Sequence, residues 1–471
     1  MSSREKARTT GRKDLAGLRV TVMGLGLHGG GLATARFLAG AGASVTVTDM
    51  KDEGALAEPL ASLAGLPIRF VLGRHEMADF SEADLVVKNP AVRPDSPYLR
   101  AAKAVETDIS LFLRASAAPL IAVTGSKGKS TVATALHHGL VSAGRKAFLG
   151  GNITVSPLQF IDETGPDTPV VLELSSWQLA DLKGLGVLKP QVALLTSIMP
   201  DHMNRYTSME EYVADKRLIY ADQDASCHTV LNREDLWSPL FAAETRGRVA
   251  WYMDRRDRDQ GGAWLEGRRG WYAADRDAGP EEILPEDLLV PGGHQRKNLL
   301  GAALALRLFG LEAAAISHAM GSFRGVEHRL EAFAEAQGVA WYNDSAATIP
   351  QAVAAALESF EEPVVLITGG TDKNLDFEPV HGAYARAKAL ILLAGSGTEK
   401  LRSWLDRDGI AYTGPYEQLE EAVDEAARRA APGDKIILSP GCTSFGMFLH
   451  EFDRGRKFKE AVGRYIAGRE S

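Results

Sequence analysis

The sequence predicts an α/β protein built from three domains in series, and three observations indicate this fold class. Short apolar runs typical of buried parallel strands alternate with helical patterns through most of the chain. Two of these runs pass through a glycine-rich turn directly into a helical pattern. The length of 471 residues also exceeds what one hydrophobic core usually supports. We expect the domains to span residues 1–113, 114–321 and 322–471.

The bulk composition is that of a globular protein and limits the choice of partners. Hydrophobic residues make up 45% and charged residues 24% of the chain, and the formal net charge is -8. Proteins that bind nucleic acid or anionic membranes usually carry a basic excess, so neither partner is expected. Cys227 and Cys442 are the only cysteines, too few for a disulfide framework. The N-terminus has no apolar signal region and the chain has no apolar run long enough to span a membrane, so we expect a cytoplasmic protein.

The first predicted domain opens with a glycine turn between a strand and a helix. The strand "LRVTVMG" leads through Gly24, Gly26 and Gly29 into the helical pattern "GLATARFLAGAG", and the strand "SVTVTDM" follows. Backbone N–H groups at such a helix N-terminus can face a diphosphate, and Asp49 ends the next strand where an acid can meet a ribose or base. A nucleotide diphosphate, a nicotinamide cofactor and purely structural glycines are all compatible with this pattern.

A second glycine loop, at the start of the central domain, has a more specific composition. The strand "APLIAVTG" runs into a helical pattern through Gly125, Ser126, Lys127, Gly128, Lys129, Ser130 and Thr131. The loop is shorter than the G-x-x-x-x-G-K-[ST] pattern, but its glycines permit close approach of the backbone to a phosphate. The Lys129 ammonium can neutralise a terminal phosphate, and the Ser130 hydroxyl can ligate Mg²⁺. We expect this loop to bind nucleotide phosphates.

An acidic residue, Glu173, ends the apolar strand "PVVLEL". A carboxylate in such a run is destabilising unless it is paired or bound to a cation. Beside a phosphate-binding loop Mg²⁺ is the natural partner, and a salt bridge or a capping role is the alternative. Ser175, Ser176 and Gln178 in "ELSSWQL" add further polar groups.

Two more candidate residues follow the strand "QVALLT". His202 lies in "MPDHMNRY" and Lys216 in "YVADKRLIY". Their spacing alone decides nothing, because a lone histidine is more often structural and a helical lysine is usually solvated. Residues 246–290 are expected to form short β segments, and the helix "KNLLGAALALRLFG" follows, with Gly310 at its end.

The third predicted domain carries four polar clusters at the ends of strand-like runs. They are "HRLE" around Arg329, "WYNDSAATIP" around Asp344, "TGGTDKNLDF" around Lys373 and "LSPGCTSFGMF" around Ser444. Ligands of open α/β sheets gather at the carboxyl ends of strands, so these clusters are candidates for a binding site. Ordinary turns are an equally good interpretation of the clusters taken alone.

A series of motifs runs along nearly the whole chain in a fixed order: "GLGLHGG", "TGSKGKST", "GGNI", "LELSSWQL", "DHMNRY", "YVADK", "GGHQRKN", "HRLE", "NDSAAT", "GGTDKN" and "LSPGCTS". At these motifs the chain resembles the Mur ligase family, in the branch that joins glutamate to UDP-N-acetylmuramoyl-L-alanine in peptidoglycan synthesis. The resemblance implies a Rossmann-like domain for the UDP substrate, a central P-loop ATPase domain and a Rossmann-like C-terminal domain for the amino acid. It also implies ATP, two Mg²⁺ sites, D-glutamate as the added amino acid, and a monomer.

The resemblance implies the following roles around ATP. Lys129 and Ser130 would hold ATP phosphates and Mg²⁺, and Glu173 would complete the first metal site. His202 would ligate a second Mg²⁺. Lys216 matches a position that is commonly carbamylated in this family, which would place an anionic group near that metal. Further nucleotide contacts would come from Asn298 at the adenine and from Arg329 and Asp344 at the phosphates and ribose.

The resemblance also implies the contacts to the other two substrates. Asn152 would face the muramoyl group, with Ser175 close by. The uridine diphosphate side would be bound by Gly26, Leu27, His28 and Asp49. The carboxylates of the incoming glutamate would be bound by Thr348, Lys373 and Ser444.

The chain departs from the usual pattern of this branch at several positions. Ala346 stands where a lysine is common, and Gly446 where an aspartate is common. Glu451 stands where an aromatic residue usually lines the amino-acid pocket. Gln295 replaces an asparagine, and His28 and Ala91 depart at the uridine side. The changes at Ala346 and Glu451 bear on the choice of amino acid, since an acid aimed at glutamate would repel it.

Several alternatives to a D-glutamate ligase remain open at this point. One alternative is a ligase that performs the same reaction with another amino acid, for example L-glutamate. The N-terminal glycine turn argues against a folylpolyglutamate synthase-like ligase, and the P-loop argues against an NAD-dependent dehydrogenase. A non-catalytic nucleotide-binding scaffold is the alternative from a different class.

Overall fold

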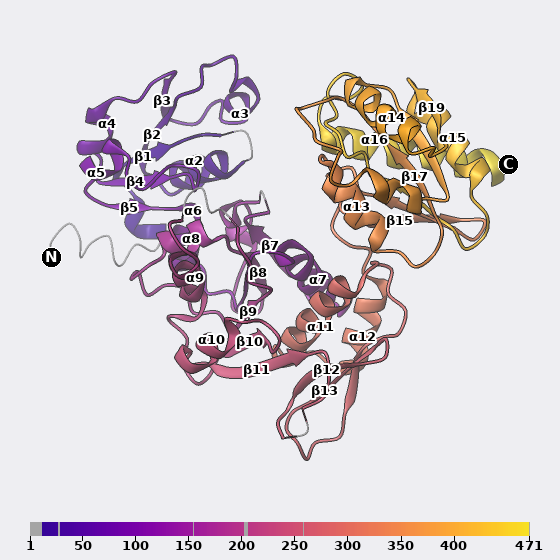
Figure 1. Cartoon of the computed structure of the whole chain (residues 1–471). Helices are drawn as coiled ribbons and strands as arrows, with labels where there is room; N and C mark the ends of the chain where they lie inside the picture. Colours follow the sequence, from indigo (N-terminus) through magenta and orange to yellow (C-terminus); the bar gives the residue numbers. More distant parts are fainter. Residues whose placement is uncertain (1–11, 27–28, 154, 202–205, 258, 471) are drawn as a thin grey trace. The chain divides into compact units, whose positions relative to one another are not determined.

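The computed structural model of the chain describes residues 12–26, 29–153, 155–201, 206–257 and 259–470 (Figure 1). The chain forms two compact units, a larger one of Met1–Glu286 and Asn298–Met320 and a smaller one of Asp287–Lys297 and Gly321–Ser471. The described residues form three sheets in series, each with helices packed against it, which confirms the predicted α/β class. The predicted domain boundary at residue 321 lies next to Met320, where the larger unit ends.

The first sheet of the larger unit is wholly parallel over its described strands, in the order β3-β2-β1-β4-β5. The strands are β1 Arg19–Met23, β2 Ser44–Asp49, β3 Ile68–Leu72, β4 Leu85–Lys88 and β5 Val105–Glu106. The helices are η2 Arg12–Leu15, α2 Gly30–Gly40, α3 Ala57–Ala61, α4 Met77–Ser81, α5 Pro97–Ala101 and α6 Asp108–Ala115. Residues of β1 are buried from Val20 to Met23 because the sheet is covered on both faces, as parallel sheets usually are.

The predicted glycine turn lies between β1 and α2. Gly29 precedes α2 with a φ of +85°, a conformation that favours glycine. A Cβ atom at Gly31 would lie 2.3 Å from the carbonyl oxygen of Gly24, so only glycine lets the helix begin this close to the strand end. The turn is therefore a tight junction that presents backbone at the carboxyl edge of the sheet.

The second sheet of the larger unit has the order β14-β13-β12-β11-β10-β9-β6-β8-β7 over the described residues, with parallel pairing except for the antiparallel β12–β13–β14 edge. Its strands are β6 Leu120–Thr124, β7 Phe148–Gly151, β8 Val170–Glu173, β9 Val192–Leu195, β10 His228–Asn232, β11 Arg248–Met253, β12 Gly262–Glu266, β13 Arg269–Ala273 and β14 Glu281–Leu284. Strands β11 to β14 confirm the short β segments expected between residues 246 and 290.

Helices pack closely against this second sheet. They are α7 Lys129–Ser142, η3 Pro157–Gln159, η4 Ile161–Glu163, α8 Ser176–Asp181, α9 Met209–Lys216, η5 Arg217–Tyr220, α10 Ser238–Glu244, α11 Gly293–Leu308 and α12 Ala313–Ser322. Helix α7 approaches α11 so closely that a Cβ atom at Gly139 would lie 2.3 Å from Leu306 Cδ1. Gly310, with a φ of +96°, follows the end of α11 as predicted.

The smaller unit contains a mixed sheet whose described strands have the order β15-β16-β20-β17-β18-β19. Only the β15–β16 pair among these strands is antiparallel. The strands are β15 Glu331–Ala336, β16 Val339–Asn343, β17 Val364–Thr368, β18 Ala389–Leu393, β19 Thr413–Tyr416 and β20 Lys435–Leu438. The helices are α13 Pro350–Glu358, η6 His381–Arg386, α14 Ser396–Arg407, α15 Leu419–Arg429 and α16 Glu451–Glu470.

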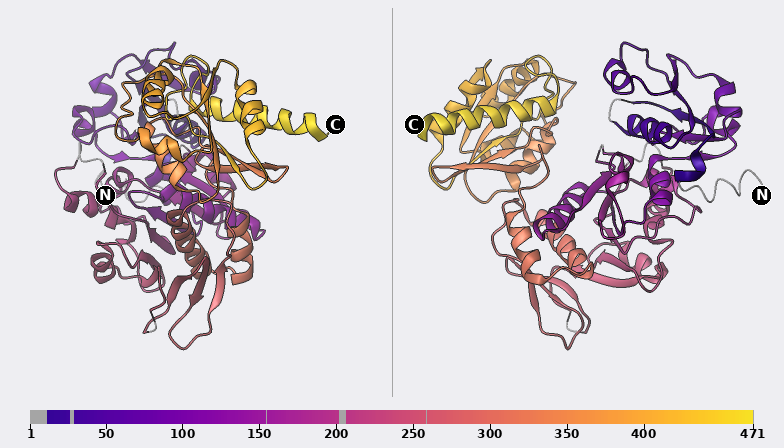
Figure 2. Two further views of the ribbon diagram at one scale, coloured as in Figure 1. Left: turned by 45° about the vertical axis from the view of Figure 1, so that its right-hand side comes forward. Right: turned by 180° about the vertical axis from the view of Figure 1, so that it is seen from behind.

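Each face of this sheet carries its own apolar core. Helices α13 and α14 supply Val353 and Leu401 to one core, together with Leu366 of β17. Helices α15 and α16 supply Val423 and Phe458 to the other, and Figure 2 shows the long α16 ending at the C-terminus. Across the described residues, no helix is both long and apolar enough to cross a membrane.

Candidate functional site

The loop between β6 and α7 has a backbone shape that requires glycine at two positions. Gly125 has a φ of +148°, and a Cβ atom there would lie 1.8 Å from Thr196 Oγ1. Gly128 has a φ of +88°, and a Cβ atom there would lie 2.5 Å from Asn298 Oδ1. Thr196 Oγ1 also donates a hydrogen bond to the Lys127 carbonyl at 2.7 Å, which ties the loop to the residue after β9. The loop is thus held in one shape, with the predicted adenine-side Asn298 beside it.

The side chains of this loop take different directions. Lys129 Nζ donates a 2.9 Å hydrogen bond to the Ser126 carbonyl. The Ser126 hydroxyl points inward, donating to the Met199 carbonyl at 2.8 Å. Lys127 is exposed, and Ser130 and Thr131 are partly buried in the first turn of α7. Among these groups, Lys129 and Ser130 are the ones suited to a phosphate and its metal ion, while Ser126 has a structural role.

A cavity of 350 Å³, the phosphate-loop cavity, gathers four of the predicted residues. Lys129, Asn152, Ser175 and Lys216 come from different elements, yet all line it. The full lining is Asn89, Pro90, Ala91, Lys129, Asn152, Ser175, Ser176, Trp177, Tyr212 and Lys216. Ser175 also caps α8, because its hydroxyl accepts a hydrogen bond from the Gln178 backbone N–H.

Glu173 at the end of β8 is buried, with 1% of its surface exposed. Its Oε1 accepts a 2.9 Å hydrogen bond from Asn152 Nδ2, which orients the carboxylate. Its Oε2 is buried and accepts no hydrogen bond from the described part of the chain. A buried carboxylate oxygen without a donor is destabilising unless a cation meets it. This oxygen therefore fits a ligand of a bound metal ion better than it fits a capping or salt-bridge role.

Lys216 at the end of α9 is almost fully buried, with 1% exposure. Its Nζ donates a 2.6 Å hydrogen bond to the Gly125 carbonyl and lies 4.6 Å from the centre of the Tyr212 ring. Burial, reinforced by the nearby Lys129 charge, lowers the pKa of Lys216 to about 7. Near neutral pH, a large fraction of the protein molecules therefore carry Lys216 as a neutral amine. His202, predicted to act beside it, lies outside the described residues.

A second cavity of 460 Å³, the glycine-loop cavity, lies at the edge of the first sheet. Its lining is Gly24, Gly26, Gly30, Asp49, Lys51, Asn89, Pro90, Ala91, Val92, Asp108, Gly151, Asn152, Ser156 and Gln178. Asn152 lines both cavities, so they share a wall. The Asp49 carboxylate accepts hydrogen bonds from the backbone N–H groups of Gly26, at 3.1 Å, and Lys51, at 2.9 Å. Asp49 therefore supports the glycine turn as well as lining the cavity, and the predicted Leu27 and His28 lie outside the described residues.

A third cavity, in the smaller unit, brings together the residues predicted to bind an amino acid. This C-terminal cavity of 420 Å³ is lined by Thr348, Ile349, Lys373, Leu375, Thr443, Ser444, Phe445 and Glu451. Thr348, Lys373 and Ser444 follow β16, β17 and β20, which are neighbours in the sheet. Glu451, the unusual acid at the start of α16, is part of the same lining.

Arg329 and Asp344 interact in the smaller unit. Asp344 is buried, and its carboxylate accepts hydrogen bonds from the Leu330 N–H at 3.1 Å and from the Ser439 hydroxyl at 2.7 Å. Burial raises the pKa of Asp344 to about 7, and the charge of the exposed Arg329 acts in the opposite direction.

Comparison with known proteins identifies the family of the chain. Residues 18–110 match the description "Mur ligase MurD-like, N-terminal domain", residues 123–306 "Mur ligase middle domain" and residues 328–442 "Mur ligase, glutamate ligase domain". The UDP-N-acetylmuramoylalanine–D-glutamate ligase of Treponema pallidum is 44% identical, with 95% of this chain and 98% of that protein covered. The chain belongs to the Mur ligase family.

Other relatives and solved structures agree with this assignment. A Mur ligase of the same name from Roseiflexus sp. is 41% identical, with 95% of this chain and 99% of that protein covered. The crystal structure of UDP-N-acetylmuramate-alanine ligase MurC from Thermotoga maritima superposes with a TM-score of 0.58 at 20% identity. The superposition covers 95% of this chain and 100% of the MurC chain, and it shows that the two proteins share a fold.

The structure of this Mur ligase adds lining residues that the sequence alone did not suggest, among them Asn89, Asp108 and Ser156. Asn89 follows β4 and lines both cavities of the larger unit. Asp108 and Ser156 line the glycine-loop cavity. Asp108 is buried, which raises its pKa, and the neighbouring Ser156 hydroxyl acts in the opposite direction. The one sequence signal at Asp108 is its position directly after Thr107, a residue type that commonly caps a helix and here caps α6.

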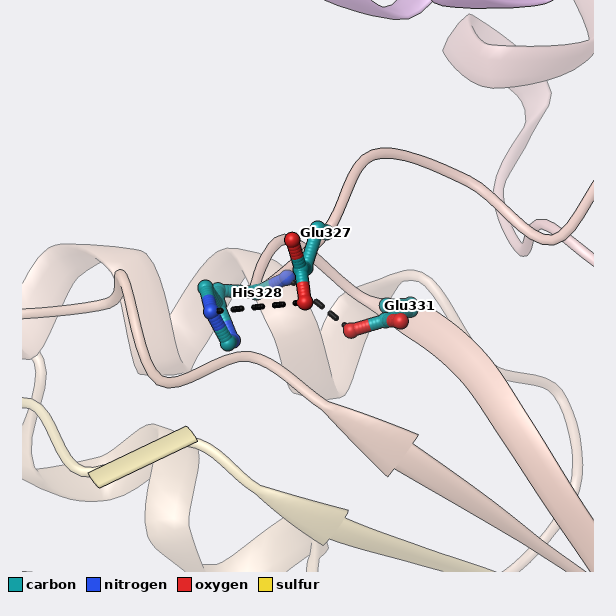
Figure 3. Close-up of side chains that lie close together, drawn as sticks. All are labelled: Glu327, His328 and Glu331. Carbon is teal, nitrogen blue, oxygen red and sulfur yellow. Dashed lines mark hydrogen bonds and ion pairs between the residues drawn. The ribbon is translucent and has the colours of Figure 1, made fainter. Parts of the chain in front are cut away.

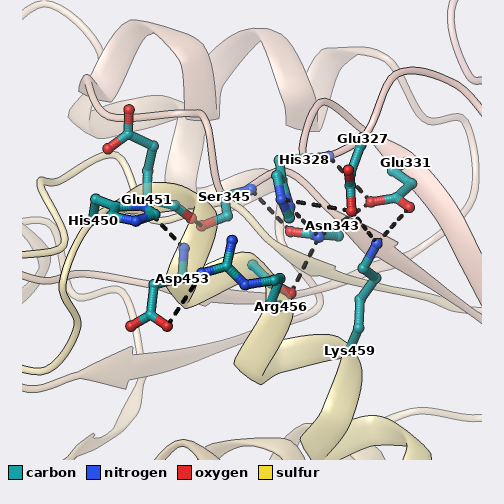
Figure 4. A network of polar contacts seen from close by, with 11 residues as sticks. Glu327, His328, Glu331, Asn343, Ser345, His450, Glu451, Asp453, Arg456 and Lys459 are labelled. Carbon is teal, nitrogen blue, oxygen red and sulfur yellow. Dashed lines mark hydrogen bonds and ion pairs between the residues drawn. The ribbon is translucent and has the colours of Figure 1, made fainter. Parts of the chain in front are cut away.

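A group of two acids and a histidine lies near Arg329 in the smaller unit (Figure 3). The ligand atoms of Glu327, His328 and Glu331 lie within 4.8 Å of one another. Lys459 Nζ already binds both acids, at 2.8 Å to Glu327 and 3.0 Å to Glu331 (Figure 4). His328 Nδ1 lies 2.8 Å from Asn343 Nδ2. The Lys459 ammonium thus supplies the positive charge of this group, and the network anchors the Arg329 loop to α16.

Arg454 of α16 holds two loops of the C-terminal cavity together. It is 1% exposed, and it donates hydrogen bonds to Ser345 Oγ at 3.0 Å, the Ser345 carbonyl at 2.8 Å and the Cys442 carbonyl at 3.1 Å. Ser345 lies three residues before Thr348, and Cys442 lies two before Ser444. Arg454 therefore fixes the spacing of the cavity walls.

We expect Arg454→Met to lower the free energy of unfolding by about 3 kcal/mol, because it leaves buried oxygens without donors. Urea unfolding followed by circular dichroism measures this change. Arg456→Met is the matched control, since Arg456 is 53% exposed and its 3.6 Å ion pair with Asp453 contributes less than about 1 kcal/mol. Equal losses in the two variants would contradict the assigned role.

Proposed function

We propose that this Mur ligase joins D-glutamate to UDP-N-acetylmuramoyl-L-alanine in cytoplasmic peptidoglycan precursor synthesis, converting ATP to ADP and phosphate. The names of the Treponema and Roseiflexus relatives support the reaction. The observation that carries the proposal is the phosphate-loop cavity, which places Lys129 and Lys216 beside Asn152, a residue shared with the glycine-loop cavity. ATP at one cavity and a UDP-linked carboxylate at the other would then meet at their common wall.

The chemistry of amide formation explains why these groups are needed. A carboxylate does not react usefully with an amine, so the γ-phosphate of ATP first passes to the alanyl carboxylate and forms an acyl phosphate. The amine of the amino acid then displaces phosphate. The protein contributes positioning and charge neutralisation, as in phosphoryl transfer generally. Lys129, which lines the phosphate-loop cavity, would offset the negative charge that keeps the carboxylate and the triphosphate apart.

We propose two Mg²⁺ sites, and the described residues fit the first of them. Ser130 and Glu173 would hold the first ion, and the orphaned Glu173 Oε2 supports this assignment. His202 and Lys216 would hold the second. Bound Mg²⁺ would supply charge neutralisation to the oxygens of the transferred phosphoryl group.

A carbamate on Lys216 is part of the same proposal. The unmodified ammonium would repel a metal ion, whereas a carbamate presents oxygen ligands to it. The burial of Lys216 and its lowered pKa favour a neutral amine, which would add to CO₂ and release one proton to solvent. The modification would then turn a buried cation into an anion beside Lys129.

We propose the remaining contacts from the family resemblance. Asn298, which lies beside Gly128, would contact adenine. Arg329 and Asp344 would contact the phosphates and ribose. Gly26 and Asp49 would bind the uridine diphosphate portion, and Ser175 would lie at the reacting end of the substrate.

The C-terminal cavity would hold the amino acid. Its lining combines the Lys373 ammonium with the hydroxyls of Thr348 and Ser444, which suit the two carboxylates of glutamate. We further propose that the enzyme is a monomer.

We expect phosphate release from ATP and UDP-N-acetylmuramoyl-L-alanine to depend on D-glutamate, with L-glutamate and uncharged D-amino acids at least about 100-fold less effective in kcat/KM. The reason is that a site built for specific polar groups leaves them unpaired when the wrong substrate binds. A phosphate-release assay with a panel of D- and L-amino acids measures the preference. Preference for any other amino acid, or turnover with a folate substrate instead, would overturn the proposal.

A further inference from the structure

The C-terminal cavity is lined by charges of both signs. Among its described lining residues, Lys373 is the one cation and Glu451 the one anion. The rest of the polar lining consists of the hydroxyls of Thr348, Thr443 and Ser444. An acid in this position needs an explanation, because a dicarboxylic amino acid is repelled by a carboxylate that faces either of its own carboxylates.

The backbone of Glu451 is held firmly at the cavity. Its carbonyl oxygen accepts a 2.7 Å hydrogen bond from Ser345 Oγ. Ser345 is held in turn by the two hydrogen bonds from the buried Arg454. Glu451 is also the first residue of the 20-residue helix α16. The position of the residue is therefore set by the fold.

The carboxylate of Glu451 is left available by this arrangement. No hydrogen bond or ion pair among the described residues engages it, although the Arg454 guanidinium attracts it electrostatically. Figure 4 shows the side chain pointing away from the network of His328, Asn343 and Lys459. An ionised acceptor at the wall of a cavity, partly screened from water, can bind a positively charged donor on the ligand.

A free amino acid supplies such a donor. Glutamate carries two carboxylates and one ammonium group before it reacts. The Lys373 ammonium and the three hydroxyls suit the carboxylates, and the ammonium group requires an acceptor in the same cavity. Glu451 is the one anionic acceptor that the described lining offers.

We propose that the Glu451 carboxylate binds the ammonium group of the incoming amino acid and so determines specificity for an amine-bearing substrate. The inference rests on the proposed function, in which this cavity receives D-glutamate. The acid then attracts the end of the substrate that becomes the nucleophile and turns the carboxylates toward Lys373. The Glu451 carboxylate also rejects a dicarboxylate that lacks the amine, because such a ligand brings no ammonium group to offset the charge of Glu451.

The test compares Glu451→Gln with the unchanged enzyme toward D-glutamate and toward glutarate, which is glutamate without its amino group. We expect the KM for D-glutamate to rise about tenfold in Glu451→Gln, while the inhibition constant of glutarate falls. The KM values for ATP and the UDP substrate should change little. Opposite effects on the two ligands cannot come from a general loosening of the cavity.

Glu460→Gln is the matched control, because Glu460 is an exposed acid on the same helix. It should leave both constants unchanged. A KM for D-glutamate that does not rise in Glu451→Gln, or a glutarate inhibition constant that rises or stays constant, would overturn the inference. If the unchanged enzyme uses a different amino acid, the proposed substrate is wrong, and the same comparison with that amino acid and its deamino analogue decides the role of Glu451.

Discussion

Lys129→Ala is expected to reduce kcat for ATP-dependent ligation by about 10²–10³-fold without unfolding the protein. Lys129 is the first residue of α7, and its ammonium lines the phosphate-loop cavity. It donates a hydrogen bond to the Ser126 carbonyl, a neutral group, and a phosphate would offer it a stronger, charge-assisted hydrogen bond. Alanine keeps the helical backbone but removes the charge that offsets the transferred phosphoryl group.

A phosphate-release assay at saturating substrates measures this loss, and a thermal melt verifies that the variant is folded. Lys146→Ala is the matched control, because it removes the same charge from an exposed lysine whose 3.1 Å partner is the exposed Glu163. The control should keep full activity. Substantial turnover by Lys129→Ala would contradict the proposed phosphate loop, and an absence of turnover in the unchanged enzyme would favour a non-catalytic nucleotide-binding scaffold.

The local parts of the fold could be predicted from the sequence because their signals are local. The strand, glycine loop and helix over residues 120–142 follow from an apolar run, glycines and a helical pattern that are contiguous in the chain. The end of α11 at Gly310 and the short strands between residues 246 and 290 have the same kind of local cause.

The C-terminal cavity shows how far such reasoning extends. Thr348, Lys373 and Ser444 were each found at the end of a strand-like run, but their proximity depends on the sheet order β16-β20-β17. The sheet order does not follow the chain order, because β20 is the last strand of the chain and lies between two earlier strands, β16 and β17, in the sheet. The resemblance to Mur ligases supplied the grouping that periodicity could not.

Side-chain direction was the part that sequence patterns could not supply. Ser126 belongs to the phosphate-binding motif, yet its hydroxyl is used inside the protein. Asp49 was assigned to a ligand, and the structure shows that it also binds the backbone of the glycine turn. Asn89 and Asp108 were missed because a polar residue after a strand or at a helix start is ordinary, and only long-range packing makes each line a cavity.

The second large effect is expected at Lys216, where Lys216→Arg should reduce kcat roughly 10–100-fold. Arginine keeps the positive charge but cannot form a carbamate, because its guanidinium stays protonated.

In the unchanged enzyme, the Lys216 pKa of about 7 sets the pH dependence of carbamylation. Below pH 7 the amine is mostly protonated and unreactive toward CO₂, and above pH 7 it is mostly neutral. Carbamylation and activity should therefore both rise between pH 6 and 8.

Carbon-13 NMR of enzyme equilibrated with labelled bicarbonate detects the carbamate directly, and turnover in CO₂-depleted buffer with and without added bicarbonate measures its effect. We expect a carbamate signal and bicarbonate-dependent activity in the unchanged enzyme, and neither in Lys216→Arg. Lys189→Arg is the control, because Lys189 is exposed and its hydrogen bond to Asp224 raises its pKa, which keeps it protonated. If Lys216→Arg keeps full activity, or if the signal persists in it, the carbamate does not act at this position, and the Lys216 amine would serve only as the donor to the Gly125 carbonyl.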